Sequence, residues 1–163
     1  MNCRYQITPS PFGEILIAAS DAGICRLDFI DQRQDLNVGQ TWIEGVHPDI
    51  RECSEQLTAY FSGDLTAFKL PLAATGTDFQ KIVWAALCDI PYGTTCSYAE
   101  LASSIDRPTA SRAVGAANGK NPIAIVVPCH RVIGANGTLT GYAGGIARKQ
   151  KLLELESRQL TLS

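Results

Sequence analysis

The chain has 163 residues, of which 45% are hydrophobic and 18% charged, and its net charge is −2. This composition is typical of a globular protein with one buried core or two small lobes, and it excludes a disordered chain and a generally basic nucleic-acid binder. Because no run of about 18 apolar residues and no basic-then-apolar amino terminus is present, we expect neither a transmembrane helix nor a secretory signal, and a cytoplasmic location.

The amino-terminal part predicts a small antiparallel sheet with one helix. Alternating apolar residues bounded by turn residues predict three strands, over residues 3–7, 14–20 and 24–30. A polar, glycine-containing loop is expected over 31–47, and apolar residues at helical spacing predict a helix over 48–61. A short apolar strand over 68–72 is expected to close this lobe.

The pattern changes from strands to helices near residues 73–77. We therefore expect a structural α/β lobe over 1–76 and a second lobe over 77–163. Two capping boxes are predicted, one at Thr77 with Gln80 and one at Ser97 with Glu100. In a capping box, the side chain at the start of a helix and the side chain three residues later each form a hydrogen bond with the other residue's backbone amide. The short helix after Ser97 is expected to run to about Ser104.

Pro108 predicts the first residue of another helix, which ends near Gly119, so the two short helices form a helix-turn-helix candidate. The second helix is almost bare of large side chains except Arg112. Such a helix either packs tightly on a neighbour or approaches a nucleic-acid backbone with Arg112 as its one long probe. Because its exposed face carries Ala and Ser rather than Asn or Gln, we expect sequence-independent binding.

Charge is segregated along the chain, because residues 107–151 contain no Asp or Glu. The basic residues of this stretch are Arg107, Arg112, Lys120, Arg131, Arg148, Lys149 and Lys151. Cys129 lies inside the stretch, at the end of an apolar run and directly before His130. The cysteines of the chain lack any C-x-x-C pair, so reduced thiols are expected. A reactive cysteine in a basic stretch suggests chemistry on a polyanion.

A free thiol is only a few per cent ionised near pH 7, so a nucleophilic cysteine needs a base or a positive field. His130 is the candidate base, but adjacent residues do not face each other on a strand or a helix, which favours a bridging water over a direct bond. A carboxylate should orient the imidazole, and Glu154 or Glu156, in a helix predicted over 146–156, is the candidate. An inert buried thiol is the alternative for Cys129.

A metal or cofactor is not expected. The chain has only two histidines and no phosphate-binding or dinucleotide-binding glycine fingerprint. The glycine-rich stretch 138–145, close behind the cysteine in sequence, is typical of a pocket lid.

The segment Pro128–Val132, with the sequence PCHRV, resembles the active-site signature of the alkylguanine-DNA alkyltransferases, also called methylated-DNA-protein cysteine methyltransferases. Further matching positions follow in the same order: Phe79, Gln80, Val83, Trp84, 90–93, Ser97, Tyr98, Leu101, Ala102, 112–115, Asn121, Pro122, Tyr142, Gly144 and Gly145. The resemblance is strong over 77–156 and weaker over the amino-terminal strands. It implies an α+β fold, with a ribonuclease H-like amino-terminal lobe and a mainly helical, winged-helix-like carboxy-terminal lobe.

The resemblance implies direct-reversal DNA repair. In this family an alkyl group on the 6-oxygen of guanine moves irreversibly to the cysteine, once per protein, after the nucleotide has been flipped out of duplex DNA. No cofactor is implied, and repair of 4-O-alkylthymine stays open. The expected partner is double-stranded DNA carrying alkylated guanine, bound through the minor groove by a monomer. No membrane association is expected, and DNA binding would bring the protein to the nucleoid.

The resemblance also assigns roles to residues around Cys129. His130 would act through water as the base for the thiol, Glu156 would orient His130, and Asn121 would brace the turn that carries the cysteine. Tyr98 would contact the everted guanine, and Arg112 would replace it in the stack. The remaining substrate- and DNA-contacting positions are Ala113, Gly115, Val132, Tyr142 and Ala143.

Some members bind a structural zinc ion in the amino-terminal lobe. Cys3 and Cys25 fall near such positions, but no completing thiol or imidazole is found, so we expect no zinc. Three other classes compete with repair. Cys129 speaks against a lesion-binding protein without an acceptor, a Cys-His hydrolase leaves the helix-turn-helix unexplained, and the bare helix disfavours a plain DNA-binding regulator.

Overall fold

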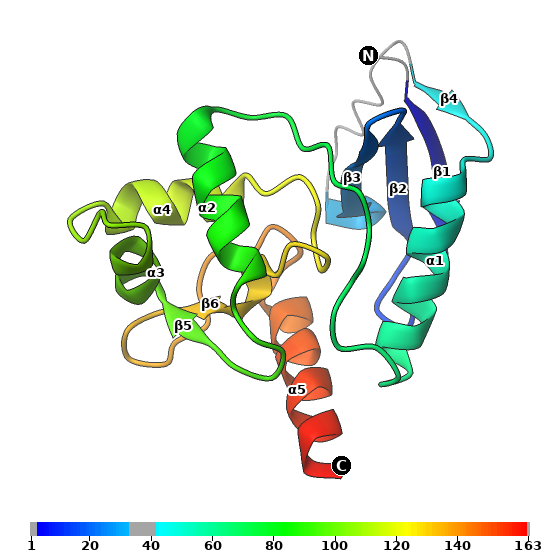
Figure 1. Cartoon of the computed structure of the whole chain (residues 1–163). Coiled ribbons are helices and arrows are strands. Elements are labelled where there is room, and N and C mark those ends of the chain that lie inside the picture. The colour runs from blue at the N-terminus through cyan, green and yellow to red at the C-terminus, as the bar shows by residue number, and fades with distance from the viewer. Residues whose placement is uncertain (1–2, 33–41, 163) are drawn as a thin grey trace. The chain divides into compact units, whose positions relative to one another are not determined.

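The computed structural model describes residues 3–32 and 42–162 (Figure 1). The chain divides into two compact units, Met1–Thr75 and Gly76–Ser163. The first unit holds a sheet and one α-helix, and the second is mainly helical, which confirms the predicted α+β class. Within the described ranges, no helix is long and apolar enough to cross a membrane.

The amino-terminal unit is a four-stranded sheet in the order β3-β2-β1-β4, packed against one helix. Its strands are β1 (Arg4–Thr8), β2 (Ile15–Ser20), β3 (Gly23–Phe29) and β4 (Ile43–Glu44), of which β1, β2 and β3 are antiparallel neighbours and β4 runs parallel to β1. Helix α1 (Pro48–Phe61) packs on β2 through Ile50, Cys53, Leu57 and Tyr60. Their spacing of three or four residues places these side chains on one face of the helix.

The strand expected over 68–72 is wrong. Only Leu72 makes a β-bridge, parallel to Ile24, and the neighbouring bond runs from the Ile24 amide to the Pro71 carbonyl at 2.8 Å. Pro71 has no amide hydrogen with which to extend a ladder. Gly23 permits this close approach, because a Cβ on it would lie 2.4 Å from the Pro71 oxygen.

The loop expected over 31–47 contains regular structure. A 3₁₀ turn, η1 (Ile30–Gln32), leads into it, and β4 lies near its end. Residues 33–41 of the predicted loop lie outside the described residues.

The carboxy-terminal unit contains four α-helices and a two-stranded sheet among its described residues. They are α2 (Asp78–Cys88), α3 (Tyr98–Ser104), α4 (Ser111–Gly119) and α5 (Ile146–Leu162), with β5 (Cys96–Ser97) parallel to β6 (Val132–Ile133). Both predicted capping boxes are confirmed, with Thr77 before α2 and Ser97 before α3. Trp84 of α2 ties this helix to α4, because its Nε1 donates to the Ala117 carbonyl at 2.9 Å.

Helices α3 and α4 pack on each other as the predicted two-helix unit. However, α4 begins at Ser111 and not at Pro108. The Ala110 amide donates to the Arg107 carbonyl at 2.9 Å, which closes a turn with Pro108 at its second position, where the fixed φ of proline is favoured. Helix α5 also continues beyond its predicted end, to Leu162.

Candidate active site

The segment before Cys129 is a series of turns held by Asn121. This amide is buried, donates from Nδ2 to the Val127 carbonyl at 2.8 Å and accepts the Ile123 amide on Oδ1 at 3.0 Å. Between these two anchors Ile125 has a φ of 70°. A β-branched residue in the left-handed region costs about 1–3 kcal/mol, so the surrounding bonds must fix this conformation.

Cys129 opens a single 3₁₀ turn, η2 (Cys129–Arg131), and its side chain is almost inaccessible, with 6% of the residue exposed. His130 is completely buried, and its Nε2 lies 2.7 Å from Oε2 of Glu156. Among the described residues, Nδ1 of His130 has no hydrogen-bond partner. The turn therefore holds a nearly buried thiol and, on the next residue, an imidazole whose Nδ1 can take up a proton.

Of the two candidate carboxylates, Glu156 contacts the histidine and Glu154 does not. Glu156 is completely buried, whereas Glu154 is exposed and accepts a hydrogen bond from Gln150 at 3.0 Å. Helix α5 packs on η2, which brings Glu156 to His130 across 26 positions of sequence.

Arg131 is a member of this cluster that the sequence reasoning missed. Its guanidinium holds Glu156 with two bonds, Nε to Oε1 at 2.9 Å and Nη2 to Oε2 at 3.1 Å, and its Nη1 donates to the Ile90 carbonyl at 2.7 Å. Such a two-pronged pair fixes the carboxylate in both position and orientation. Arg131 is 6% exposed, so it belongs to the interior and not to a basic surface.

The cluster holds a charged carboxylate and a neutral imidazole. Burial by itself raises the pKa of Glu156, but the hydrogen bonds and charges of His130 and Arg131 outweigh burial and lower this pKa to about 2. Burial lowers the pKa of His130, and the contact with Glu156 offsets it only in part. We therefore assign the single ring proton to Nε2, facing Glu156, which leaves a lone pair on Nδ1.

Tyr98, the first residue of α3, contacts the loop that follows Cys129 in sequence. Its hydroxyl donates to the Thr140 carbonyl at 3.3 Å. Its ring also lies against α4, where a Cβ added to Gly115 would be 3.6 Å from the ring. Tyr98 thus lies between the helix-turn-helix and the predicted lid loop.

Lys149 shares the Thr140 carbonyl with Tyr98, and the sequence had identified it only as one member of the basic stretch. It lies in the first turn of α5 and is completely buried, and its Nζ donates to Thr140 at 2.7 Å. A signal was present in the sequence, because Lys149, Leu152 and Glu156 recur at spacings of three and four and so lie on one face of the helix.

The other predicted contact positions differ in exposure. Arg112 and Ala113 are exposed at the start of α4, and Ala143 is exposed in the loop before α5. Tyr142 is half-buried, and Val132 is completely buried in β6. The buried side chain of Val132 cannot touch a partner, so only its backbone could do so. Arg112, Ala113 and Ala143 are exposed and can contact a partner directly.

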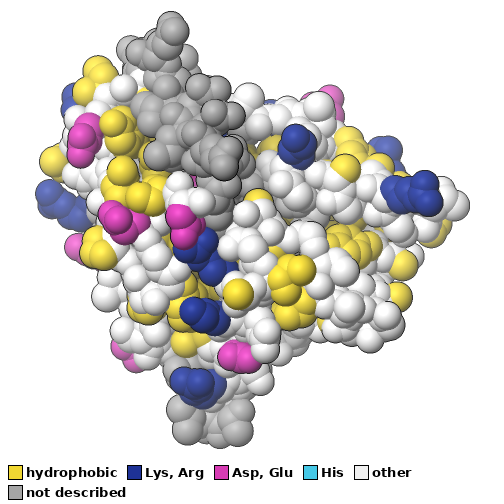
Figure 2. All heavy atoms as spheres, turned by 180° about the vertical axis from the view of Figure 1, so that it is seen from behind, with side chains coloured by type: hydrophobic (Ala, Val, Ile, Leu, Met, Phe, Trp, Pro, Cys, Tyr) yellow, Lys and Arg dark blue, Asp and Glu magenta, His cyan; other side chains and the backbone are white. Residues whose placement is uncertain are grey.

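The basic stretch of the sequence divides into buried and exposed members. Arg131 and Lys149 point inward, whereas Arg107, Arg112, Lys120 and Lys151 are exposed. Figure 2 shows one face of the molecule, on which Lys and Arg side chains lie singly, with several Asp and Glu side chains on the same face. This pattern suits a partner whose charge is spread out, such as a nucleic-acid backbone.

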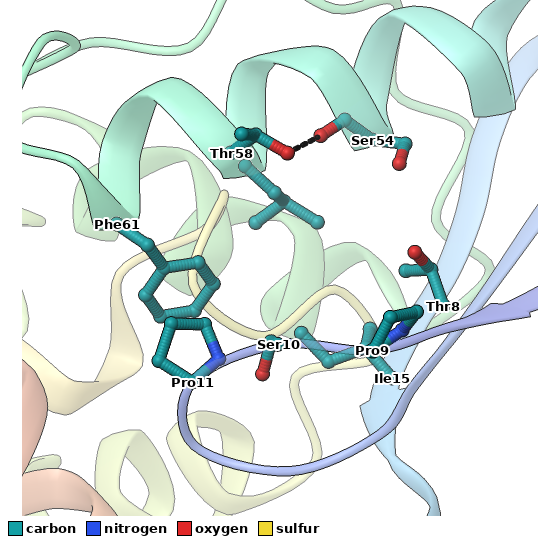
Figure 3. A pocket seen from close by; sticks show the side chains of 9 residues that line it. Thr8, Pro9, Ser10, Pro11, Ile15, Ser54, Thr58 and Phe61 are labelled. Atoms are coloured by element: carbon teal, nitrogen blue, oxygen red, sulfur yellow. Dashed lines mark hydrogen bonds between the residues drawn. The ribbon is translucent and has the colours of Figure 1, made fainter.

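A separate cavity of about 310 Å³ lies in the amino-terminal unit (Figure 3). Pro9, Pro11, Leu57 and Phe61 give it an apolar lining. The Thr58 hydroxyl on its wall already donates to the Ser54 carbonyl at 3.0 Å. The lining residues include no acid, base or thiol, so the cavity has no means of performing nucleophilic chemistry.

The residues that could hold a metal are few. The Sγ atoms of Cys3 and Cys25 lie 3.4 Å apart, and both cysteines are free thiols. Within residues 3–32 and 42–162, no group of three or more His, Cys, Asp or Glu side chains is arranged to bind a metal ion. The expected absence of zinc stays a prediction.

Two family descriptions match the sequence. Residues 78–158 match the DNA binding domain of 6-O-methylguanine DNA methyltransferase, and residues 3–74 match its ribonuclease-like domain. The methylated-DNA–protein-cysteine methyltransferase of Methanosarcina barkeri is 53% identical over 156 residues, which are 96% of this chain and 98% of the relative.

Solved structures give a similar result. The crystal structure of the Mycobacterium tuberculosis O6-methylguanine methyltransferase superposes with a TM-score of 0.89 at 48% identity, covering 98% of both chains. A crystal structure of Mycobacterium tuberculosis OGT in complex with DNA has a TM-score of 0.88 at 48% identity, covering 96% of this chain and 94% of the other.

Proposed function

The chain belongs to the 6-O-methylguanine DNA methyltransferase family, and from this membership we propose that it repairs DNA by moving an alkyl group from the 6-oxygen of guanine to Cys129. The observation that carries the proposal is the nearly buried thiol of Cys129 beside a neutral His130 that is held by Glu156. The carboxy-terminal lobe, 77–163, binds DNA and accepts the alkyl group, and the lobe over 1–76 is structural.

The thiol proton leaves first. Nδ1 of His130 takes it through a water molecule, and the imidazolium that forms is stabilised by Glu156 2.7 Å from Nε2. The thiolate then attacks the alkyl carbon in line with the oxygen. One S–C bond forms as one C–O bond breaks, and the electron pair of that bond goes to guanine, which takes up a proton.

The reaction occurs once per molecule. Its product is a thioether, which offers water no acyl carbon to attack, unlike the covalent intermediates of cysteine hydrolases. Nothing in this chemistry requires a metal or an organic cofactor. Guanine is restored in one step, while the protein retains the alkyl group on Cys129.

Duplex DNA carrying alkylated guanine is the proposed substrate. The 6-oxygen is shielded inside the stack, so the nucleotide must be flipped out at a cost of a few kcal/mol. Arg112, exposed near the start of α4, enters the stack in its place, and the small residues Ala113 and Gly115 allow this helix into the minor groove. Tyr98 meets the everted base, and Tyr142 and Ala143 form the pocket wall.

The test is a stoichiometric reaction. Monomeric protein is mixed with an equimolar amount of duplex DNA that contains one 6-O-methylguanine. The protein is then digested, and the masses of its peptides are measured. We expect one methyl group on the Cys129 peptide and none on the peptides of the other cysteines. An unmodified Cys129 peptide from protein that still binds the duplex would overturn the proposal.

A further inference from the structure

Lys149 is a buried cation that the reaction described above does not use. It is fully inaccessible to solvent, and its one recorded side-chain hydrogen bond goes to the Thr140 carbonyl at 2.7 Å. No carboxylate in the described part of the chain forms an ion pair with it. A buried charge without a counter-charge is costly, so the site must contain something that compensates for it.

Helix α5 packs on η2, the turn that carries Cys129, so the thiol of Cys129 is the candidate for the compensating group. Burial lowers the pKa of Lys149, and the charge of Cys129 acts in the opposite direction and raises it. The same ammonium acts on His130, where it helps to lower the pKa of the imidazole. Lys149 is therefore within electrostatic reach of both the thiol and its base.

The other charged and titratable groups around this turn are already paired or distant. Glu156 of α5 is held by Arg131 and His130, and Arg131 is bound in turn to Glu156 and the Ile90 carbonyl. From α2, the Cys88 thiol feels the charge of Arg131. Lys149 is thus the cation of this cluster that has no carboxylate partner.

We propose that Lys149 is a positioning residue, whose buried ammonium is the counter-ion of the Cys129 thiolate and at the same time anchors the lid loop through the Thr140 carbonyl. The proposal rests on the proposed function, because it concerns the thiolate that accepts the alkyl group. Three features carry it: the complete burial of a lysine without a carboxylate, its 2.7 Å bond to a loop carbonyl that Tyr98 also contacts, and the packing of its helix on the turn that holds Cys129.

The charge arrangement explains how a weak base suffices. A neutral His130 in a fully buried position is a poor proton acceptor, and a positive Lys149 makes it poorer still. The same positive charge stabilises the thiolate that remains once the proton has passed through water to His130. Lys149 therefore compensates for the weakness of His130 as a base by lowering the free energy of the thiolate.

The experiment measures Cys129 itself, without DNA. The rate of iodoacetamide alkylation of the Cys129 peptide is followed by mass spectrometry from pH 5 to 10 in the wild type, Lys149→Met and Lys149→Arg. Lys151→Met, an exposed lysine of the same helix, is the matched control. We expect the pH midpoint to rise by about one unit or more in Lys149→Met, and to stay near that of the wild type in the other two variants.

At a pH below both midpoints the rate in Lys149→Met should fall about threefold, because a tenfold loss of thiolate is partly offset by a more nucleophilic sulfur. An unchanged midpoint in folded Lys149→Met would overturn the proposal. Equal shifts in Lys149→Met and Lys149→Arg would overturn it as well, because packing and not charge would then be responsible.

If Lys149→Met does not fold, the wild type still provides a test. Lysine labelled with ¹³C at the ε carbon is titrated by NMR before and after Cys129 has been alkylated by iodoacetamide. Loss of the thiolate should lower the pKa of Lys149, and an unchanged titration would refute the pairing. Failure of the repair assignment would appear separately, as a Cys129 that reacts with iodoacetamide but takes no methyl group from methylated DNA.

Discussion

Two buried cysteines, Cys53 in the amino-terminal unit and Cys129 in the carboxy-terminal unit, lie in different charge environments. Cys53 lies on α1 with no exposed surface, and burial raises its pKa to about 12. Cys129 is nearly as inaccessible, but His130 follows it, and Lys149 lies within electrostatic reach. The two thiols differ in the charges around them, so chemistry should follow those charges and not accessibility.

The backbone around the two cysteines differs as well. Cys53 occupies one position of an amphipathic helix, where any small apolar side chain would serve. Cys129 follows a chain of turns that includes Ile125 at a φ of 70° and is braced by Asn121. Regular structure buries Cys53 as part of a core, whereas Cys129 is held by irregular structure with a residue in the left-handed region, as is common at functional sites.

The largest effect should come from replacing these two cysteines. Cys129→Ser should reduce methyl transfer below detection, because a serine hydroxyl is not ionised near pH 7, while binding to methylated duplex is retained. Cys53→Ala should leave transfer within about twofold and lower the free energy of unfolding by about 1–2 kcal/mol. Transfer assays and urea unfolding measure both, and transfer by Cys129→Ser would refute the assignment of the acceptor.

Glu156→Gln tests the charge cluster. The neutral amide would leave Arg131 buried without a counter-charge, which should cost about 3–5 kcal/mol of unfolding free energy. Methyl transfer should slow by about a hundredfold, because His130 loses the carboxylate that orients it. Glu154→Gln, an exposed change on the same helix, is the control and should alter neither quantity.

The same carboxylate predicts an acid limit. The pKa of Glu156 is about 2 in the folded protein and 4.5 for the free group, so its contribution to stability is fully present above pH 4.5 and is lost as the pH falls toward 2. The loss amounts to about 3 kcal/mol. Urea unfolding at pH 5 and pH 3 should show about 2 kcal/mol of this loss in the wild type and much less of it in Glu156→Gln.

Arg112→Ala should have a smaller effect, confined to duplex DNA. Without the inserted side chain, less of the free-energy cost of flipping the nucleotide out of the duplex is offset. Methyl transfer from duplex DNA should therefore slow about tenfold. The pH profile of iodoacetamide alkylation at Cys129 should stay unchanged, because Arg112 is exposed on α4 and belongs to no hydrogen bond of the cluster. Full-rate repair of duplex by this variant would remove the flipping role.

Features of the fold that depend on neighbouring residues were predictable from sequence. The capping boxes at Thr77 and Ser97 and the apolar face of α1 are local patterns, and all of them are formed. Pro108 was ambiguous, because the fixed φ of proline suits both the first residue of a helix and the second residue of a turn. The structure forms the turn, and a local pattern could not decide between the two.

Features that depend on distant partners were harder to predict. The sequence counted Arg131 and Lys149 only as members of a basic stretch, although charged residues are seldom buried and both are inaccessible. Their burial depends on Glu156, 25 positions from Arg131, and on the Thr140 carbonyl. The nucleophile and its base were readable because they are adjacent in sequence, whereas the groups that set their charge come together only when α5 packs on η2.

The smallest effect is expected when the residue that caps the start of a helix is replaced, in one helix of each unit. His47 begins α1 by accepting the Asp49 amide at 3.1 Å, and Ser97 begins α3 by accepting the Glu100 amide at 3.0 Å. His47→Ala and Ser97→Ala should each cost about 1 kcal/mol in urea unfolding. Only Ser97→Ala should also slow methyl transfer, by about threefold, because Tyr98 is the next residue and its contact with Thr140 depends on where α3 starts. Equal slowing in both variants would mean that transfer follows overall stability, and the functional distinction between the two units would be lost.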